Sequence, residues 1–127
     1  MNLVIATFAA LAAAVHGYIF WLESVAFDSP TTRAAFRIRT PEQAEAIRPW
    51  AYNQGFYNLF LGLAVLAGVA LLLGGATTVG VTAICFGAAV MLAAAALLGI
   101  SDRKMLKPAL VQGIAPALTL LAIAVTR

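Results

Sequence analysis

Charged residues are scarce in this sequence. They make up 10% of the 127 residues, whereas hydrophobic residues make up 63%. A typical soluble domain is about 25% charged and about 45–50% apolar. A chain of this length cannot hide so much apolar surface from water, so we expect its solvent to be lipid. The few basic residues form no long run, and we therefore expect no nucleic-acid partner.

Cysteine and histidine occur once each. Cys85 cannot form a disulfide within the chain. Because it lies inside an apolar stretch, we predict that its side chain is buried and acts as a small apolar group. A metal site needs about three or four protein ligands. His16 and a few carboxylates make a poor set of ligands, so we predict no metal site and no cofactor.

Four apolar stretches are each long enough to cross the hydrocarbon core as a helix. They predict an all-α integral membrane protein in which residues 1–127 form one domain, a bundle of four transmembrane helices. The first fifteen residues contain no Lys or Arg, so the basic start of a secretory signal is missing and the first stretch is interpreted as a retained span. The stretches are residues 3–26, 50–74, 78–100 and 106–126.

The connection between the first two spans carries helix signals and predicts one or two short interfacial helices. Ser29 followed by Pro30 is typical of an N-cap with proline at the first helical position. Thr40 and Gln43 have the spacing of a capping box, which predicts a second helix start. Pro49 is predicted to end that segment and to open the second span.

Basic residues predict the orientation of the chain. Seven of the eight Lys and Arg residues lie in the first and third connections, which share one side of a four-span bundle. Because cytoplasmic loops are enriched in Lys and Arg, loops 27–49 and 101–105 are expected in the cytoplasm and both termini outside. The seven are Arg33, Arg37, Arg39, Arg48, Arg103, Lys104 and Lys107.

Polar side chains inside the spans are the strongest functional signal. Such groups are costly in a bilayer and mark functional sites by default. His16 and Glu23 are seven residues apart, close to two helical turns, and so share one helix face. With polar groups of the second and fourth spans they are expected to form a pocket in the cytoplasmic half of the bundle. The candidate catalytic residues are His16 and Glu23, and the candidate ligand-binding residues are Asn53, Gln54, Tyr57, Asn58 and Gln112.

A structural role for the same side chains is the main alternative. Amides and hydroxyls often join transmembrane helices by hydrogen bonds. Glu23 can reach toward the membrane surface, and His16 can be a neutral imidazole bonded to Asn58 or Tyr57. Gly and Ala residues in the second and third spans favour close packing within the bundle or between copies, which leaves a homo-oligomer open.

Two motifs resemble the signatures of a known family. Residues 16–23 read HGYIFWLE and match H-x-Y-I-x-x-L-E, and residues 53–61 read NQGFYNLFL and match N-Q-G-x-Y-N-x-F-L. Residues 112–117 match Q-G-x-P-A loosely. The motifs are similar to those of small bacterial four-span membrane proteins of unknown function, and the resemblance covers nearly the whole chain. It implies a bacterial inner-membrane location and importance for His16, Glu23, Asn53, Gln54 and Asn58, but no activity.

Three functions remain open at this point. The preferred one is a cytoplasm-facing pocket that binds a small amphipathic or lipid-like ligand and acts on it by acid–base chemistry at His16 or Glu23. A proton-coupled small-molecule transporter is the second, although the outer half of the spans lacks polar residues for a path. A structural or accessory membrane subunit is the third.

Overall fold

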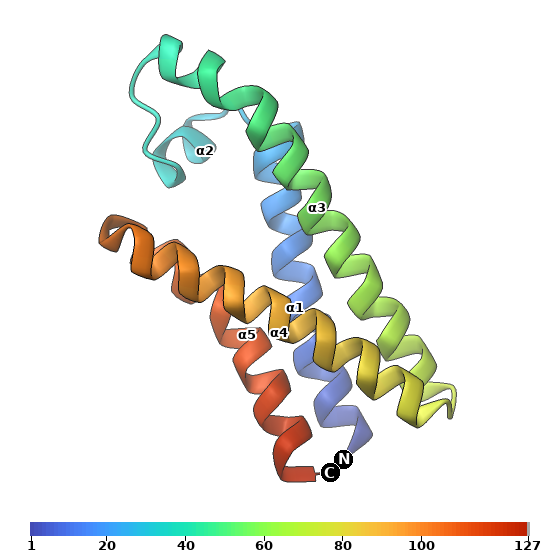
Figure 1. The fold of residues 1–127 in the computed structure, drawn as a ribbon. Coiled ribbons are helices and arrows are strands. Elements are labelled where there is room, and N and C mark those ends of the chain that lie inside the picture. Colours follow the sequence, from blue (N-terminus) through green and yellow to red (C-terminus); the bar gives the residue numbers. More distant parts are fainter. Residues whose placement is uncertain (127) are drawn as a thin grey trace.

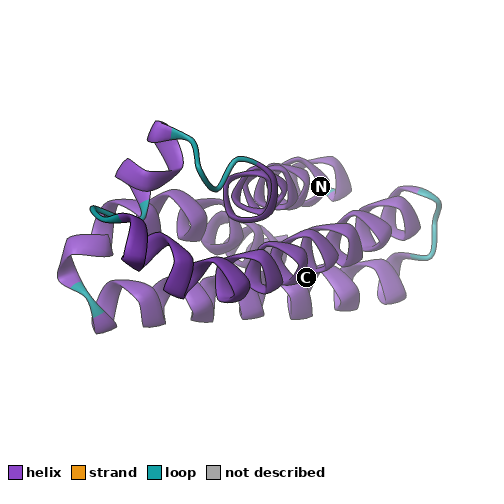
Figure 2. Cartoon of the chain, turned by 90° about the horizontal axis from the view of Figure 1, so that it is seen from above, coloured by secondary structure: helices purple, strands orange, loops and turns teal. Residues whose placement is uncertain are grey.

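The computed structural model is a bundle of four long helices, and it describes residues 1–126 (Figure 1). No strand is present in that part of the chain, as the view from above also shows (Figure 2). Four helices are long and apolar enough to cross a membrane, at Asn2–Val25, Pro41–Leu73, Thr77–Ser101 and Arg103–Thr126. The predicted all-α, four-helix membrane bundle is therefore confirmed.

The first of these segments is not a uniform α-helix. Helix α1 (Asn2–Phe20) continues into a single π-helical turn, η1 (Trp21–Val25). A short helix, α2 (Pro30–Ala35), follows, and its N-cap is Ser29, whose side chain accepts a hydrogen bond from the Thr32 N–H. The predicted Ser29–Pro30 helix start is thus confirmed.

The expected break at Pro49 is wrong. Helix α3 runs without interruption from Pro41 to Leu73, with Pro49 inside it. The helix start at Thr40 is correct, because the Thr40 hydroxyl accepts the Gln43 N–H at 3.3 Å. The Gln43 side chain, however, accepts the N–H of Arg39 at 2.9 Å rather than that of the cap residue. Pro49 removes only one backbone donor, and the turns on both sides keep theirs, so the interfacial helix and the second span merge.

The remaining helices follow the predicted spans. The turn after α3 contains Gly75 in a left-handed conformation (φ 94°), which lets α4 (Thr77–Ser101) fold back at once. A 3-10 turn, η2 (Arg103–Met105), then leads to α5 (Leu106–Thr126). In the bundle α1 packs against α3 and α5, and α4 packs against α3 and α5, whereas α1 and α4 hardly touch.

Small residues allow the helices to approach closely. A Cβ at Gly62 of α3 would lie 3.2 Å from the backbone oxygen of Ala13 in α1, and Gly80 of α4 meets the backbone of α3. The buried core between the helices includes Ile5, Val65 and Met91. Glycine at these crossings leaves no side chain between the backbones, as is usual for helix pairs in membranes.

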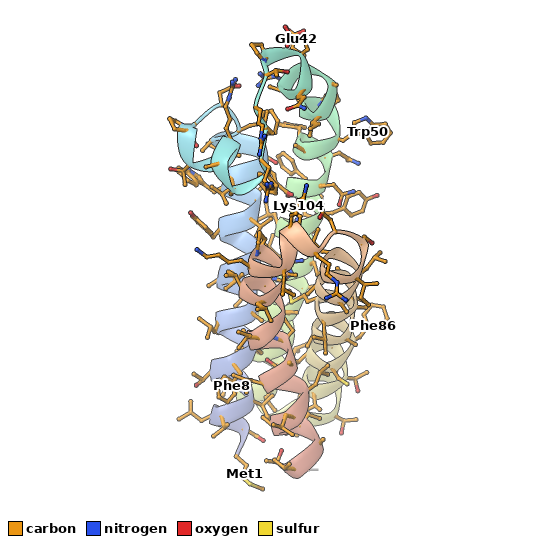
Figure 3. The ribbon with its side chains drawn as sticks, turned by 90° about the vertical axis from the view of Figure 1, so that its left-hand side faces the viewer. Met1, Phe8, Glu42, Trp50, Phe86 and Lys104 are labelled. Atoms are coloured by element: carbon orange, nitrogen blue, oxygen red, sulfur yellow. The ribbon has the colours of Figure 1, made fainter. Side chains whose placement is uncertain are left out.

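The two ends of the bundle differ. Met1 and Phe8 lie toward one end, and Trp50 and Glu42 lie at the other, farther along the bundle than Lys104 (Figure 3). We call the end that carries the α1–α3 connection and the α4–α5 turn the basic end, because it holds the seven basic residues identified above. At 1.5 Å per residue the 33 residues of α3 extend roughly 50 Å, longer than the ~30 Å hydrocarbon core. Because its charged residues Glu42, Glu45 and Arg48 lie near its start, we expect α3 to project beyond the hydrocarbon at this end.

Candidate functional site

The site is built around the π-helical turn at the end of the first span. The N–H of Ala26 donates to the oxygen of Trp21 at 2.7 Å, five residues back, in place of the usual four. Such wider turns are rare and are frequently found at functional sites. Glu23 lies in the middle of this turn, whereas His16 lies one turn before it in the regular helix α1.

Thr32 of α2 joins the connection between the first span and α3 to this turn by hydrogen bonds. Its hydroxyl lies 2.7 Å from the oxygen of Ala26 and 3.4 Å from the oxygen of Leu22, and it accepts a bond from the Ser29 hydroxyl at 3.0 Å. The side chain is fully buried. Thr32 thus supplies a hydroxyl donor to carbonyl groups at the end of the first span, where the oxygen of Ala26 also accepts the N–H of Ser29 at 3.0 Å. The sequence signalled the cap at Ser29 but not the surface to which Thr32 docks.

Glu23 and Asn58 join the first span to α3. The Asn58 side-chain amide donates to Oε2 of Glu23 at 3.0 Å and lies 3.0 Å from the backbone oxygen of Gln54. Next to this bond the Ser24 hydroxyl donates to the backbone oxygen of Tyr52 at 3.0 Å. The two helices can come this close because residue 55 is glycine, whose missing Cβ would overlap Oγ of Ser24.

Glu23 also borders a recess of about 210 Å³. The other residues that line it are Phe27, Phe36, Ile47 and Ala51, all of them apolar. They come from three segments, namely the end of the first span, the loop after α2 and the start of α3. The recess therefore combines one carboxylate with an apolar wall, whereas the sequence predicted a pocket lined by several amides.

Asp28 connects α2 and α3 beside the recess. Its carboxylate binds Arg48 of α3 through two bonds of 2.7 and 2.8 Å and Arg33 of α2 at 3.2 Å. These hydrogen bonds, first from Arg48 and then from Arg33, lower the pKa of Asp28 to about 2. The Arg48 guanidinium also lies 5.2 Å from the centre of the Phe27 ring, a cation–π contact with one of the residues that line the recess.

His16 has a partner other than the expected ones. Its Nδ1 lies 2.9 Å from the backbone oxygen of Ala12, one turn earlier in the same helix, and 1% of its surface is exposed. The bond to Asn58 or Tyr57 that the structural alternative offered for His16 is not present within residues 1–126. A carbonyl of its own helix is nearer, and Asn58 is occupied by Glu23.

The other predicted residues do not converge on Glu23. Asn53, Gln54 and Tyr57 are exposed on α3, and Gln112 is half-buried on α5. Asn53 and Tyr57 each stand two residues from the buried Gly55, which places them about 200° around the helix from the face that meets the first span. Of the seven predicted residues the structure brings Glu23 and Asn58 into contact, and the roles assigned to the other five stay predictions.

Metal ligands are not clustered in the described part of the chain. Within residues 1–126 no three His, Cys, Asp or Glu side chains come together. The chemistry available at the recess is that of one hydrogen-bonded carboxyl group beside aromatic and aliphatic side chains. Such a group can accept hydrogen bonds from a ligand or exchange a proton with it.

The comparison with known protein families identifies the family of the chain. The chain belongs to the family described as protein of unknown function (DUF1304), whose model matches residues 10–124. No curated protein and no solved structure matches it. The predicted family of unknown function is thereby confirmed, and the function has to be inferred from the site.

Proposed function

We propose that this membrane protein binds the polar head of a small amphipathic ligand at Glu23. The observation that carries the proposal is the position of this carboxylate, which Asn58 orients at the edge of an otherwise apolar recess. A carboxylate is a strong acceptor, so the head group that fits is a donor such as an amine or a hydroxyl. The apolar part of the ligand would lie against Phe27, Phe36 and Ile47.

The location of the recess supports a ligand drawn from the membrane. It lies at the basic end, where the first span ends and α3 leaves the hydrocarbon. We infer from the distribution of Lys and Arg that this end, with loops 27–49 and 101–105, faces the cytoplasm and that both termini lie outside. The motifs support a bacterial inner membrane as the location. A molecule of the inner leaflet would then meet Glu23 at the depth where its own head group lies.

Acid–base chemistry, if the ligand is also a substrate, falls to Glu23. His16 is enclosed in the core and its Nδ1 is occupied by Ala12, so it has no access to the recess. Glu23 borders the recess directly and is the group within reach of a ligand proton.

Binding of single-chain amphiphiles to the purified protein tests the proposal. Dodecylamine, dodecanol and dodecanoate share one chain and differ in the head group, and native mass spectrometry can count the bound molecules. We expect the amine and the alcohol to bind in preference to the carboxylate. In Glu23→Gln we expect amine binding to weaken about tenfold or more, because a hydrogen bond to a charged group contributes roughly 1.5–3 kcal/mol.

Glu45→Gln is the matched control, since it makes the same chemical change at an exposed residue of α3. Equal binding by the wild type and Glu23→Gln would refute the proposal. An equal loss in both variants would show general charge attraction instead of a site.

A further inference from the structure

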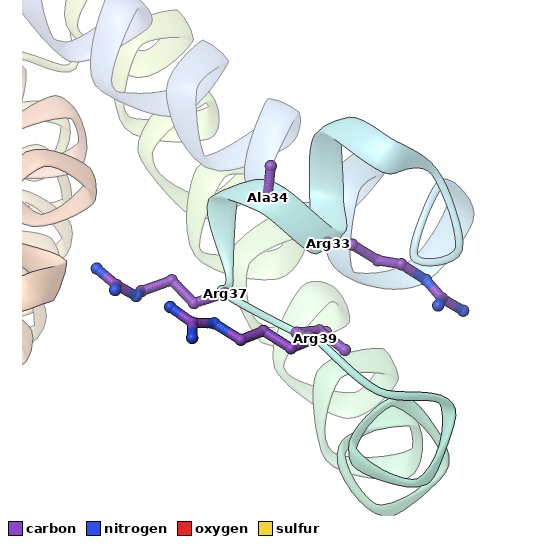
Figure 4. A pocket seen from close by; sticks show the side chains of 5 residues that line it. Arg33, Ala34, Arg37 and Arg39 are labelled. Atoms are coloured by element: carbon purple, nitrogen blue, oxygen red, sulfur yellow. The ribbon is translucent and has the colours of Figure 1, made fainter.

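The loop after α2 holds a second recess with a different chemistry. It measures about 330 Å³ and is lined by Arg33, Ala34, Arg37, Ile38 and Arg39. Arg37 and Arg39 extend in the same direction, toward the side on which the α4–α5 turn lies, whereas Arg33 extends away from them (Figure 4). Two neighbouring guanidinium groups therefore face one region beside the bundle.

The charges of Arg37 and Arg39 are not balanced within residues 1–126. Asp28 forms ion pairs with Arg33 and Arg48, and neither Arg37 nor Arg39 has an ion pair there.

Two hydrogen bonds fix the backbone at Arg37, where the chain leaves α2. Arg37 has a φ of 57°, in the left-handed region that glycine favours. Its N–H donates to the oxygen of Ala34 at 3.3 Å, and the N–H of Ile38 donates to the oxygen of Arg33 at 2.9 Å. These bonds form a Schellman motif, in which glycine is the usual residue at this position. Because the last carbonyls of α2 are thereby occupied, they are less available to repel an anion.

We propose that Arg37 and Arg39 form a binding site for a phosphate group. Guanidinium groups bind phosphate oxygens through paired N–H bonds, and clusters of basic residues beside a membrane span bind anionic lipids. The phosphate can belong to a lipid head group or be free in solution. The site is separate from the Glu23 recess. It would bind an anion, whereas the Glu23 recess would bind a ligand that donates a hydrogen bond, so either proposal can fail without the other.

Lipid binding to the detergent-purified protein tests the site. Native mass spectrometry compares anionic phosphatidylglycerol with zwitterionic phosphatidylcholine, and added inorganic phosphate serves as competitor. We expect one saturable phosphatidylglycerol and a loss of about 30-fold in its affinity when Arg37 and Arg39 both become Gln, from the contribution of two basic residues at a membrane surface. The matched control, Arg103 and Lys104 both changed to Gln, removes the same charge from the same end of the bundle.

Arg37→Gly provides a second variant that should fold. It removes one guanidinium group and places the favoured residue at a left-handed position, so weaker lipid binding cannot come from a damaged loop. Displacement by millimolar inorganic phosphate would identify a free anion as ligand, and resistance to it would identify the lipid. An equal loss in both double variants, or lipid binding unchanged in the Arg37–Arg39 double variant, would overturn the site.

Discussion

The crossing of α3 and α4 predicts a large difference between two glycine substitutions. A Cβ at Gly80 would lie 2.5 Å from the nitrogen of Leu72 and 2.8 Å from the oxygen of Gly68, and both are backbone atoms. To restore an ordinary contact of 3.4 Å the helices would have to separate by about 0.9 Å. Neither atom belongs to a flexible side chain, so Gly80→Ala forces the whole crossing apart.

The expected difference in the free energy of unfolding follows from two opposing contributions. Overpacking of this kind costs about 1–3 kcal/mol. Replacing glycine by alanine inside a helix stabilises the helix by up to about 1 kcal/mol, and this contribution is the same at every such position. Gly17 of α1 has no atom within 4 Å of its missing Cβ, so Gly17→Ala keeps the gain without the clash. We therefore expect Gly80→Ala to be less stable than Gly17→Ala by about 1–3 kcal/mol.

Unfolding of the two variants in mixed micelles with increasing dodecyl sulfate, followed by circular dichroism, measures this difference. The wild type should lie between the variants or close to Gly17→Ala. If Gly80→Ala unfolds at the same dodecyl sulfate fraction as Gly17→Ala, the backbone contact between α3 and α4 is not what limits their approach, and the reasoning fails.

Three further predictions concern the basic end. Thr32→Val keeps the shape of the side chain but removes the hydroxyl that bonds to the oxygens of Ala26 and Leu22. Because the oxygen of Ala26 keeps the N–H of Ser29 as a donor, thermal unfolding should show a loss of about 0.5–1.5 kcal/mol. The lowered pKa of Asp28 stabilises the folded state above its ordinary value near 4, and this stabilisation should disappear as the pH falls from about 4 to about 2. The melting temperature of Asp28→Asn should therefore differ from that of the wild type at pH 6 and converge with it at pH 2. Arg37→Gly should raise stability by roughly 1 kcal/mol in the same thermal assay, because the left-handed backbone no longer carries a side chain.

Local signals in the sequence predicted the helices well. The lengths of the four apolar stretches predicted the four spans. Ser29 and Thr40 predicted two helix starts, and each side chain accepts a bond from the N–H three residues ahead. Pro49 misled the prediction, because one missing donor is too weak a signal to end a helix whose neighbouring turns are intact.

The candidate site was predictable only in part. Glu23 stood out as a carboxylate in an apolar span, and Asn58 as an amide in the next one. Their pairing depends on the π-turn and on Gly55, which set the rotation and the separation of the two helices. A constant helical period cannot predict such a turn, so the contact between Glu23 and Asn58 could not be predicted from the sequence. Asn53 and Tyr57 were placed inward because polarity alone does not say which helix face meets a neighbour.

The proline inside α3 has a mechanical consequence for the Glu23 recess. Pro49 has no N–H, so the oxygen of Glu45 receives no bond from it and the helix is weakest against bending at this point. Ile47 and Ala51 flank it, and both line the recess. Bending of α3 at Pro49 would move Ile47 relative to Ala51 and so change the width of the recess.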